Sequence, residues 1–228
     1  MGARYFAKNN TKVLSEIGAG VIGRACVAAL MVVLKQVEEI RIYDINQDAA
    51  QKYCQELSET YGVRAVAVES VEAAVRGADV INVATAGAVS PEIQDEWLKE
   101  GVLLTLPASA ALSLNTMKSA RIVVDNWKMY EAYAQELRGL PGGYAANLSG
   151  ICGYLMDLVE GGEIPQQDIV NLGDVIAGKQ EGRRDDQERV IFIMDGMPIE
   201  DLAWGYTVYE NAKEMGLGTK LNLWEKTR

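Results

Sequence analysis

Short apolar runs recur along the first half of the chain and alternate with longer, more polar stretches. The runs are continuous rather than alternating, which is typical of parallel strands buried on both faces. Strands that alternate with stretches of helical length predict an α/β fold with a doubly wound parallel sheet. Strands are expected at 12–17, 40–43, 63–68, 79–84, 102–106 and 121–124, and helices at 21–36, at 47–60 after the N-cap Asn46, and in a short stretch after the N-cap Ser70.

The pattern changes after residue 126. A helix is expected at 127–137, and the four glycines that follow predict a mobile loop at 138–150. A further helix is expected at 166–176. One more apolar run, 189–194, predicts a last strand.

The end of the chain reads as a helical extension. Pro198 suits the first turn of a helix, and Gly216 lies where such a helix would end. We therefore expect a sheet domain over 11–196, followed by a C-terminal helix and tail over 197–228. Helical spacing in this extension is followed by Ile199, Leu202, Ala203, Tyr206 and Ala212.

A glycine pattern follows the first expected strand. Gly18-Ala19-Gly20-Val21-Ile22-Gly23 is GxGxxG, and it lies between a strand and a helix. In such a pattern the first glycine permits a tight turn, the second lets the backbone approach a pyrophosphate, and the third lets the helix pack on the strand. The helix N-terminus then offers free N–H groups to the phosphates. The pattern predicts a dinucleotide site.

Asp44 strengthens that prediction, because it ends the second expected strand, 24 positions after Gly20. A carboxylate there binds the ribose 2′-OH of NAD and repels the 2′-phosphate of NADP. Ile45 follows it and is assigned to the same site. The cofactor we expect is NAD. The alternative is a chance glycine turn beside a surface aspartate.

Two further loops leave strands at the edge where ligands bind in such folds. Ala84-Thr85-Ala86 follows the fourth strand, and its small side chains would let a nicotinamide ribose come close. Asp125 and Asn126 follow the sixth strand. The alternatives are an ordinary turn for the first loop and a helix N-cap for the second.

Glu16 departs from the pattern. It lies in the first strand, two residues before Gly18, where an apolar side chain is expected. A buried carboxylate has to be paired or protonated. We expect Glu16 at an edge of the helical cover, or paired with a lysine or arginine.

Composition removes several classes of function. The chain of 228 residues contains no histidine, which excludes Ser-His-Asp and Cys-His catalysis and most zinc sites, so no metal is expected. A net charge of −10 argues against a nucleic-acid partner. Three well-separated cysteines favour reduced thiols and a cytoplasmic location. Neither a signal peptide nor a membrane-spanning run is expected, because the longest apolar run, 25–34, is too short.

Taken together, these residues resemble the ornithine cyclodeaminase/μ-crystallin family. The resemblance implies a Rossmann NAD(P) domain and chemistry on α-amino acids. It places Gly18, Gly20, Gly23, Asp44, Thr85 and Asp125 on the cofactor side, and Asp195-Gly196 near the nicotinamide. The similar stretches are IGAGVIGRACVAAL, IRIYDINQDAAQKY, VEAAVRGADVINVATA, IVVDN, LGDVIAGKQEGR and IEDLAWGYTVYENAKEMGLGTKL.

The chain departs from the family pattern in two ways. Family members are longer, and their N-terminal portion builds most of a substrate and dimerisation domain, so 197–228 is expected to be the remnant of that domain. Cyclodeaminases also carry a catalytic aspartate after the fifth strand, whereas 106–112 has no carboxylate here. We expect a partner subunit that carries the missing half, or a homo-oligomer that covers the apolar tail. Leu217, Leu221, Leu223 and Trp224 belong to that tail.

Hydride transfer needs no histidine, because the cofactor carries the chemistry. The acid/base candidates are Asp125, Asp195, Lys128 and Tyr130, and Arg138 is a candidate clamp for a substrate carboxylate. Each has a purely structural alternative. The expected function is NAD(H)-dependent oxidation or reduction of a small α-amino or imino acid. The alternatives are an NAD-dependent cyclodeaminase and a non-catalytic nucleotide-binding protein.

Overall fold

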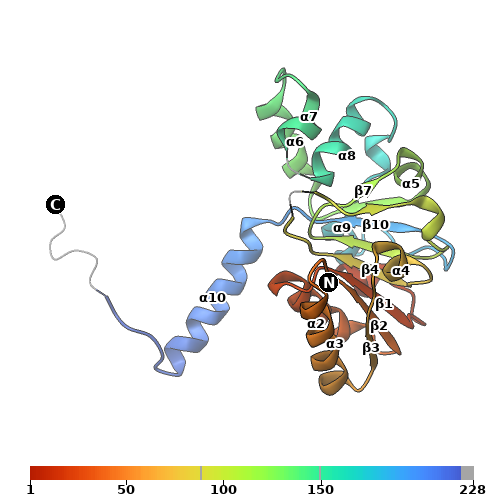
Figure 1. Cartoon of the computed structure of the whole chain (residues 1–228). Coiled ribbons are helices and arrows are strands. Elements are labelled where there is room, and N and C mark those ends of the chain that lie inside the picture. The colour runs from red at the N-terminus through yellow and green to blue at the C-terminus, as the bar shows by residue number, and fades with distance from the viewer. Residues whose placement is uncertain (88, 149, 222–228) are drawn as a thin grey trace. The chain divides into compact units, whose positions relative to one another are not determined.

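The computed structural model describes residues 1–87, 89–148 and 150–221, and the chain divides into two compact units, Met1–Asp195 and Gly196–Arg228. Within the described residues, the first unit is built around one sheet of eight strands, in which all neighbours run parallel (Figure 1). The predicted doubly wound α/β fold is confirmed. The order across the sheet is β3 (Arg64–Ala67), β2 (Glu39–Tyr43), β1 (Val13–Ile17), β4 (Val80–Val83), β6 (Leu103–Leu106), β10 (Val190–Ile193), β8 (Arg121–Val124) and β9 (Val170–Asn171).

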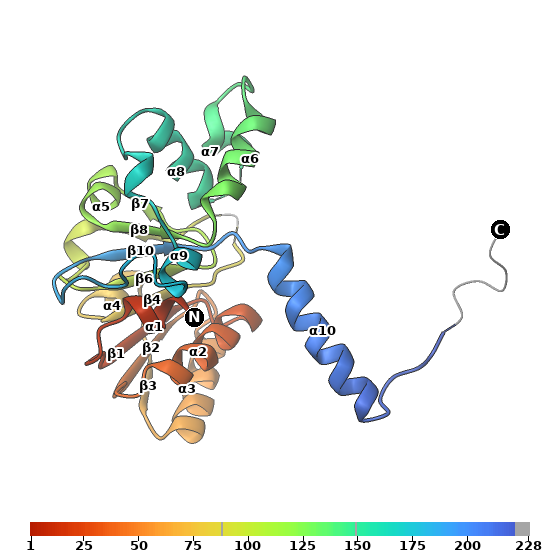
Figure 2. The same cartoon turned by 180° about the vertical axis from the view of Figure 1, so that it is seen from behind.

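Helices cover both faces of this sheet, as the two opposite views show (Figures 1 and 2). Residues of a single strand alternate between the two covers, so Leu14 packs in one apolar cluster and Ile17 in the other. One cluster takes in α1 (Gly2–Phe6), α2 (Val21–Val33), α3 (Gln47–Tyr61) and α9 (Leu172–Ile176). The other takes in α4 (Val71–Val75), α5 (Leu114–Ser119), α6 (Trp127–Leu137), α7 (Gly143–Asn147) and α8 (Ile151–Glu160).

The last strand of the chain is placed inside the sheet. β10 lies between β6 and β8 and pairs with both in parallel. Its carboxyl end is therefore next to that of β8, which precedes it by more than 60 residues. This neighbourhood brings Asp195 close to Asp125.

The helix expected at 166–176 is wrong. The segment is a 3-10 turn (Gln166–Asp168), the edge strand β9 and the short helix α9. Val170 pairs with Val123 of β8, and both side chains are buried. Pairing with the edge of the sheet satisfies the backbone hydrogen-bonding groups of this segment and also buries the Val170 side chain.

The glycine-rich segment 138–150 is also not wholly a loop, because it contains α7. The Asp157 carboxylate accepts hydrogen bonds from the backbone N–H groups of Tyr144 (2.7 Å) and Ala145 (2.9 Å), which satisfies the first turn of that helix. Besides these segments, five more of the described elements were not expected from the sequence: α5, α8, a 3-10 turn (Asp95–Trp97), and the short strands β5 (Glu92–Ile93) and β7 (Ala111–Leu112).

Local capping follows the predicted chemistry. The Asn46 side chain accepts from the N–H of Ala49, and Ser70 accepts from that of Ala73, at the starts of α3 and α4. Asn126 caps α6 in the same way, by accepting from the N–H of Lys128. The alternative interpretation of Asn126 as an N-cap is therefore correct.

The second unit contains α10 (Pro198–Glu214), which begins at the expected proline. None of its described residues is buried. Leu217 and Leu221 of the predicted apolar tail are exposed, whereas Leu223 and Trp224 lie outside the described residues. The assignment of this unit to a second domain stays a prediction. None of the described helices is long and apolar enough to cross a bilayer.

Candidate functional site

The glycine turn joins the ends of three strands. Gly18 has φ +114°, and a Cβ there would lie 2.5 Å from the carbonyl oxygen of Ala84 at the end of β4. Its N–H donates to the Tyr43 carbonyl at the end of β2 (2.8 Å). A side chain at this position would collide with the backbone and would also strain it. Gly18 therefore fixes the turn at the reversal point of the strand order.

The other two glycines have opposite surroundings. A Cβ on Gly23 would lie 2.1 Å from the Gly18 carbonyl oxygen, so the first turn of α2 packs directly on the glycine turn. Gly20, in contrast, has no heavy atom within 4 Å of the place where a Cβ would be. It is the N-cap residue of α2 and provides no side-chain cap. Open space at a helix N-terminus with available N–H groups suits an anionic group such as a pyrophosphate.

Asp44 lies beside this turn. One carboxylate oxygen accepts from the N–H of Ala19 (2.7 Å), and the other accepts from the N–H of Asn46 (2.8 Å). Each carboxylate oxygen can accept more than one hydrogen bond, so capacity remains for a hydroxyl group. Ile45 is 91% exposed next to it, and Val21 and Ile22 are exposed on the first turn of α2. The polar turn is thus bordered by apolar side chains that suit a flat ring.

A cavity of about 420 Å³ opens near the carboxyl ends of β4, β6 and β10. Ala84 is buried and does not line the cavity, whereas Thr85 is half-buried and Ala86 is exposed. Thr85 and Ala86 line the cavity together with residues from distant parts of the sequence. These include the polar residues Ser109 and Asp195 and the sulfur-containing Cys152.

Asp125 and Asp195 meet at this edge and differ in environment. Asp125 is buried, with one carboxylate oxygen accepting from the N–H of Asn126 (2.9 Å) and the other from that of Asp195 (3.0 Å). It therefore ties the end of β10 to the end of β8. Asp195 is exposed and lines the cavity. Gly196 belongs to the second unit, and its place at the cofactor stays a prediction.

The remaining predicted groups lie elsewhere. Lys128 and Arg138 are exposed at the two ends of α6, and neither lines the cavity. Their catalytic and clamping roles stay predictions. Tyr130 is fully buried, stacked on Trp127 with 5.3 Å between ring centroids. Because its side chain is buried and stacked, the acid/base role of Tyr130 stays a prediction without structural support.

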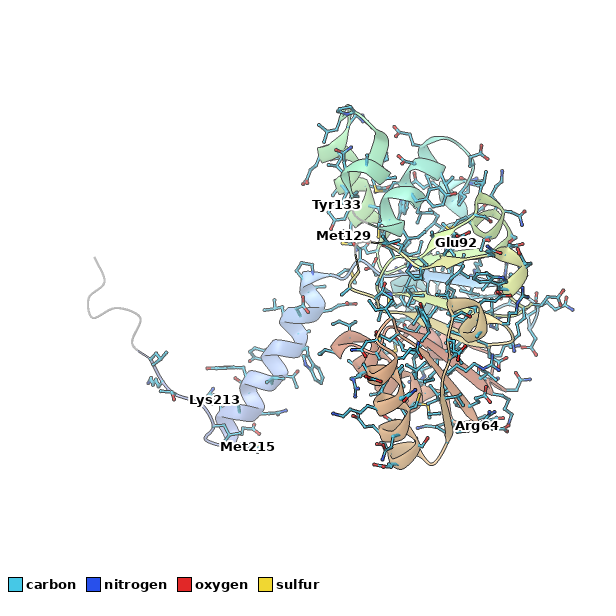
Figure 3. All side chains as sticks on the ribbon, viewed as in Figure 1. Arg64, Glu92, Met129, Tyr133, Lys213 and Met215 are labelled. Atoms are coloured by element: carbon cyan, nitrogen blue, oxygen red, sulfur yellow. The ribbon has the colours of Figure 1, made fainter. Side chains whose placement is uncertain are left out.

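Two residues near Asp195 were not found from the sequence. Tyr133 lies one turn beyond Tyr130 on α6, near Met129, and is only half-buried (Figure 3). Burial and the neighbouring Asp195 carboxylate raise the pKa of its phenol. Burial also raises the pKa of the Cys152 thiol to about 12, so this cysteine stays protonated near neutral pH. The period of α6 is the only sequence signal for Tyr133, because it shares a face with Met129.

A larger cavity, of about 1030 Å³, lies at the opposite edge of the sheet. Several of its charged side chains engage in ion pairs, including Lys118 with Glu163 (2.8 Å) and Arg121 with Glu188 (3.7 Å). Among the described residues, no group of three cysteine, aspartate or glutamate side chains is arranged to hold a metal ion.

Comparison with known proteins agrees with this geometry. The model of the ornithine cyclodeaminase/mu-crystallin family matches residues 1–216. The chain belongs to this family. The family resemblance predicted from the sequence motifs is therefore confirmed.

Comparison with three relatives shows how much of each protein resembles this chain. An alanine dehydrogenase of Archaeoglobus fulgidus is 31% identical over 97% of the chain and 63% of its own length. The structure of Thermococcus litoralis Δ1-pyrroline-2-carboxylate reductase, in complex with NADH and L-proline, is 27% identical, with a TM-score of 0.77 over 96% of this chain and 64% of that one. An archaeal alanine dehydrogenase dimer with bound NAD is 28% identical, with a TM-score of 0.76 over 98% and 64%. The chain thus spans less than two thirds of the length of each of these relatives.

Proposed function

We propose that the carboxyl edge of the sheet binds NAD(H), with the diphosphate at the glycine turn. The observation that carries this proposal is the contrast between Gly20 and Gly23. The backbone is open where a diphosphate has to approach and is closed where the helix has to pack. Asp44 lies beside the turn, where its carboxylate would accept a hydrogen bond from a ribose 2′-hydroxyl. The complexes of two relatives with NADH and NAD support the same assignment.

We further propose that the chain takes part in hydride transfer to or from a small α-amino or imino acid. NAD(H) supplies the hydride chemistry when it is bound. The residues of the chain orient the reactants and handle charge. Thr85 and Ala86 border the cavity next to the glycine turn, and Asp195 presents an exposed carboxylate to it. Asp125 orients that carboxylate through the backbone of β10.

Asp195 is the best-placed group for proton exchange with the nitrogen of the substrate. It lies at the cavity, whereas Asp125 is buried and both of its oxygens accept backbone N–H groups. Ser109, from the loop where cyclodeaminases are expected to carry an aspartate, accepts a hydrogen bond from the N–H of Ile151 (3.1 Å). It therefore braces α8 and offers no carboxylate, which favours hydride transfer over cyclodeamination.

A substrate panel tests this function. The full chain is mixed with NAD and single amino acids, or with NADH and the corresponding imino acids, and the nicotinamide absorbance is followed. Net change of NADH with at least one substrate is expected. Ammonia release without net change would instead favour the cyclodeaminase alternative. Tight binding without turnover, also in the presence of candidate partner chains, would favour the non-catalytic one.

We also propose that α10 packs against a second polypeptide, which is either a partner subunit that completes the substrate site or another copy of the chain. Most apolar side chains along this helix are exposed to solvent, and the exposed fraction of Trp204 is 73%. Exposed apolar surface of this extent is typical of interaction sites.

A cytoplasmic setting agrees with the three cysteines, all of which are unpaired.

A further inference from the structure

Glu16 is the most unusual residue beneath the proposed site. It lies in the middle of β1, between Ile42 of β2 and Asn82 of β4, and its exposed fraction is 0%. The expectation of an edge position or of a pairing with a lysine or arginine is wrong. Among the described residues the hydrogen-bond partner of its carboxyl group is the neutral Asn82. An ionised carboxylate so placed would be very costly to bury.

The carboxyl group begins a polar row across the central strands. The Asn82 side-chain amide donates to Glu16 Oε2 (2.8 Å), and the Thr105 hydroxyl donates to Asn82 Oδ1 (2.7 Å). The three residues are cross-strand neighbours on β1, β4 and β6, and all are buried. The row ends on apolar side chains, Ile42 on one side and Phe192 on the other. A matched row of this kind in an apolar sheet indicates a specific task for Glu16, because apolar residues would fill the same space more cheaply.

The second carboxyl oxygen points to the glycine turn. Within the part of the chain that the structure describes, Glu16 Oε1 has no hydrogen-bond partner, although it is buried. It lies 2.6 Å from the place where a Cβ on Gly23 would be, and the Gly18 carbonyl oxygen lies 2.1 Å from that same place. The carboxyl group is therefore directly behind the turn whose outer side is open at Gly20.

The charged and titratable groups around Glu16 offer it little compensation. On α2 they are Cys26 and Arg24, and Arg24 pairs with Glu56 and lies over the Tyr53 ring (4.2 Å). Tyr53 itself faces Glu16 from α3, and Asp44 is held at Ala19 beyond the end of β2. Burial raises the pKa of Glu16 well above its usual value, and the hydrogen bond from Asn82 lowers it less.

We propose that Glu16 is a positioning residue for the dinucleotide, which supports the glycine turn as a neutral carboxylic acid and weakens diphosphate binding when it ionises. This inference rests on the proposed NAD(H) site. The physical reason is that a negative charge behind the N-terminus of α2 opposes the positive end of the helix dipole and repels the diphosphate. A bound diphosphate in turn favours the protonated acid, since coupling between two sites is reciprocal.

The direction of the pH dependence follows from this coupling. Dinucleotide affinity is highest while Glu16 is protonated, at pH values below its pKa in the free protein. It falls as the pH rises through that pKa, and it levels off above the higher pKa of the complex. If the two pKa values differ by about one unit, the Kd for NADH rises by about tenfold across this pH window.

Titrations of the full chain with NADH at increasing pH test the proposal, with Glu16→Gln as the isosteric neutral variant. Glu16→Gln is expected to bind NADH as the unmodified chain does at pH values where Glu16 is protonated, and to lack the loss of affinity at higher pH. Cys26→Ser is the control, because it removes the neighbouring thiol that titrates in the alkaline range and should keep the loss. Asn82→Leu should move the loss to higher pH, because it removes the hydrogen bond that lowers the pKa of Glu16.

The proposal is overturned if Glu16→Gln keeps the loss of affinity at higher pH, or if the folded variant binds NADH poorly at every pH. An infrared difference spectrum gives a readout that needs no ligand. A carboxylic-acid C=O band is expected at pH values below the loss of affinity, and it should be absent in Glu16→Gln. If the band is missing, the role of Glu16 is refuted even where NADH binds. If the band is present but neither chain binds NADH, the dinucleotide site fails and the proposed role of Glu16 fails with it.

Discussion

Asp44 combines two tasks at the edge of the glycine turn. Its carboxylate holds the N–H groups of Ala19 and Asn46, which orders the backbone around the turn. It also brings a negative charge to the place where a ribose 2′-substituent would lie. The first task supports any dinucleotide, whereas the second separates NAD from NADP.

Replacement of Asp44 should therefore narrow the preference between the two cofactors. A hydrogen bond to a charged group contributes about 1.5–3 kcal/mol, so Asp44→Ala should weaken NADH binding by about tenfold or more while NADPH loses less or gains. Asp44→Asn keeps an acceptor for Ala19 and should preserve the turn better. Calorimetric titration of both variants with both cofactors measures the change.

Asp48 provides the matched control for this experiment. It carries the same charge on the first turn of α3 and is exposed, so Asp48→Ala should leave the preference unchanged. An unchanged preference in Asp44→Ala would contradict the role assigned to Asp44.

Individual residues were predictable where a motif fixes the backbone. The spacing of the motif correctly predicted the surroundings of Gly18, Gly23 and Asp44, because β1, the glycine turn, α2 and β2 follow one another directly along the chain. Tyr130 and Glu16 were not predictable, because their surroundings come from distant segments. Tyr130 is buried beside Cys152 (3.6 Å from hydroxyl to sulfur), and Glu16 finds its partner on β4.

At the scale of elements, the local pattern predicted the strands of the eight-stranded sheet up to β8, and it failed where a segment joins an existing edge. β9 has two residues and no period of its own, so only its pairing with β8 makes it a strand. The insertion of β10 between β6 and β8 has no local signal either. That insertion builds the part of the site where Asp125 meets Asp195, so the cavity was only partly predictable.

The helix α10 carries the prediction about association. Ile199, Leu202, Tyr206 and Tyr209 follow one another at spacings of three and four residues, so they share one face, and all four are exposed. Native mass spectrometry of the full chain should therefore show a complex with a partner chain or with further copies. Leu202→Glu on this face should weaken the complex.

Val208→Glu is the matched control, because Val208 is also apolar and exposed but lies on the opposite side of α10. It should leave the complex intact. A chain that stays monomeric without any partner and has full activity would contradict this role of α10.

At the scale of the whole molecule, the family match covers most of the chain, but the chain spans less than two thirds of the length of its relatives. The family match extends over residues 1–216, and the sheet unit contains the glycine turn, Asp44 and the cavity. The side chains and backbone groups of that unit account for cofactor binding better than for substrate binding. Recognition of the amino acid is therefore expected to need groups beyond Asp195.

The claim that underlies the other proposals is that the glycine turn binds NAD(H). Parallel calorimetric titrations of the full chain with NADH and NADPH test it most directly. We predict one NADH site per chain and a Kd for NADPH at least about tenfold higher, because Asp44 repels the 2′-phosphate. Equal affinities for the two cofactors, or no binding of either, would contradict the account.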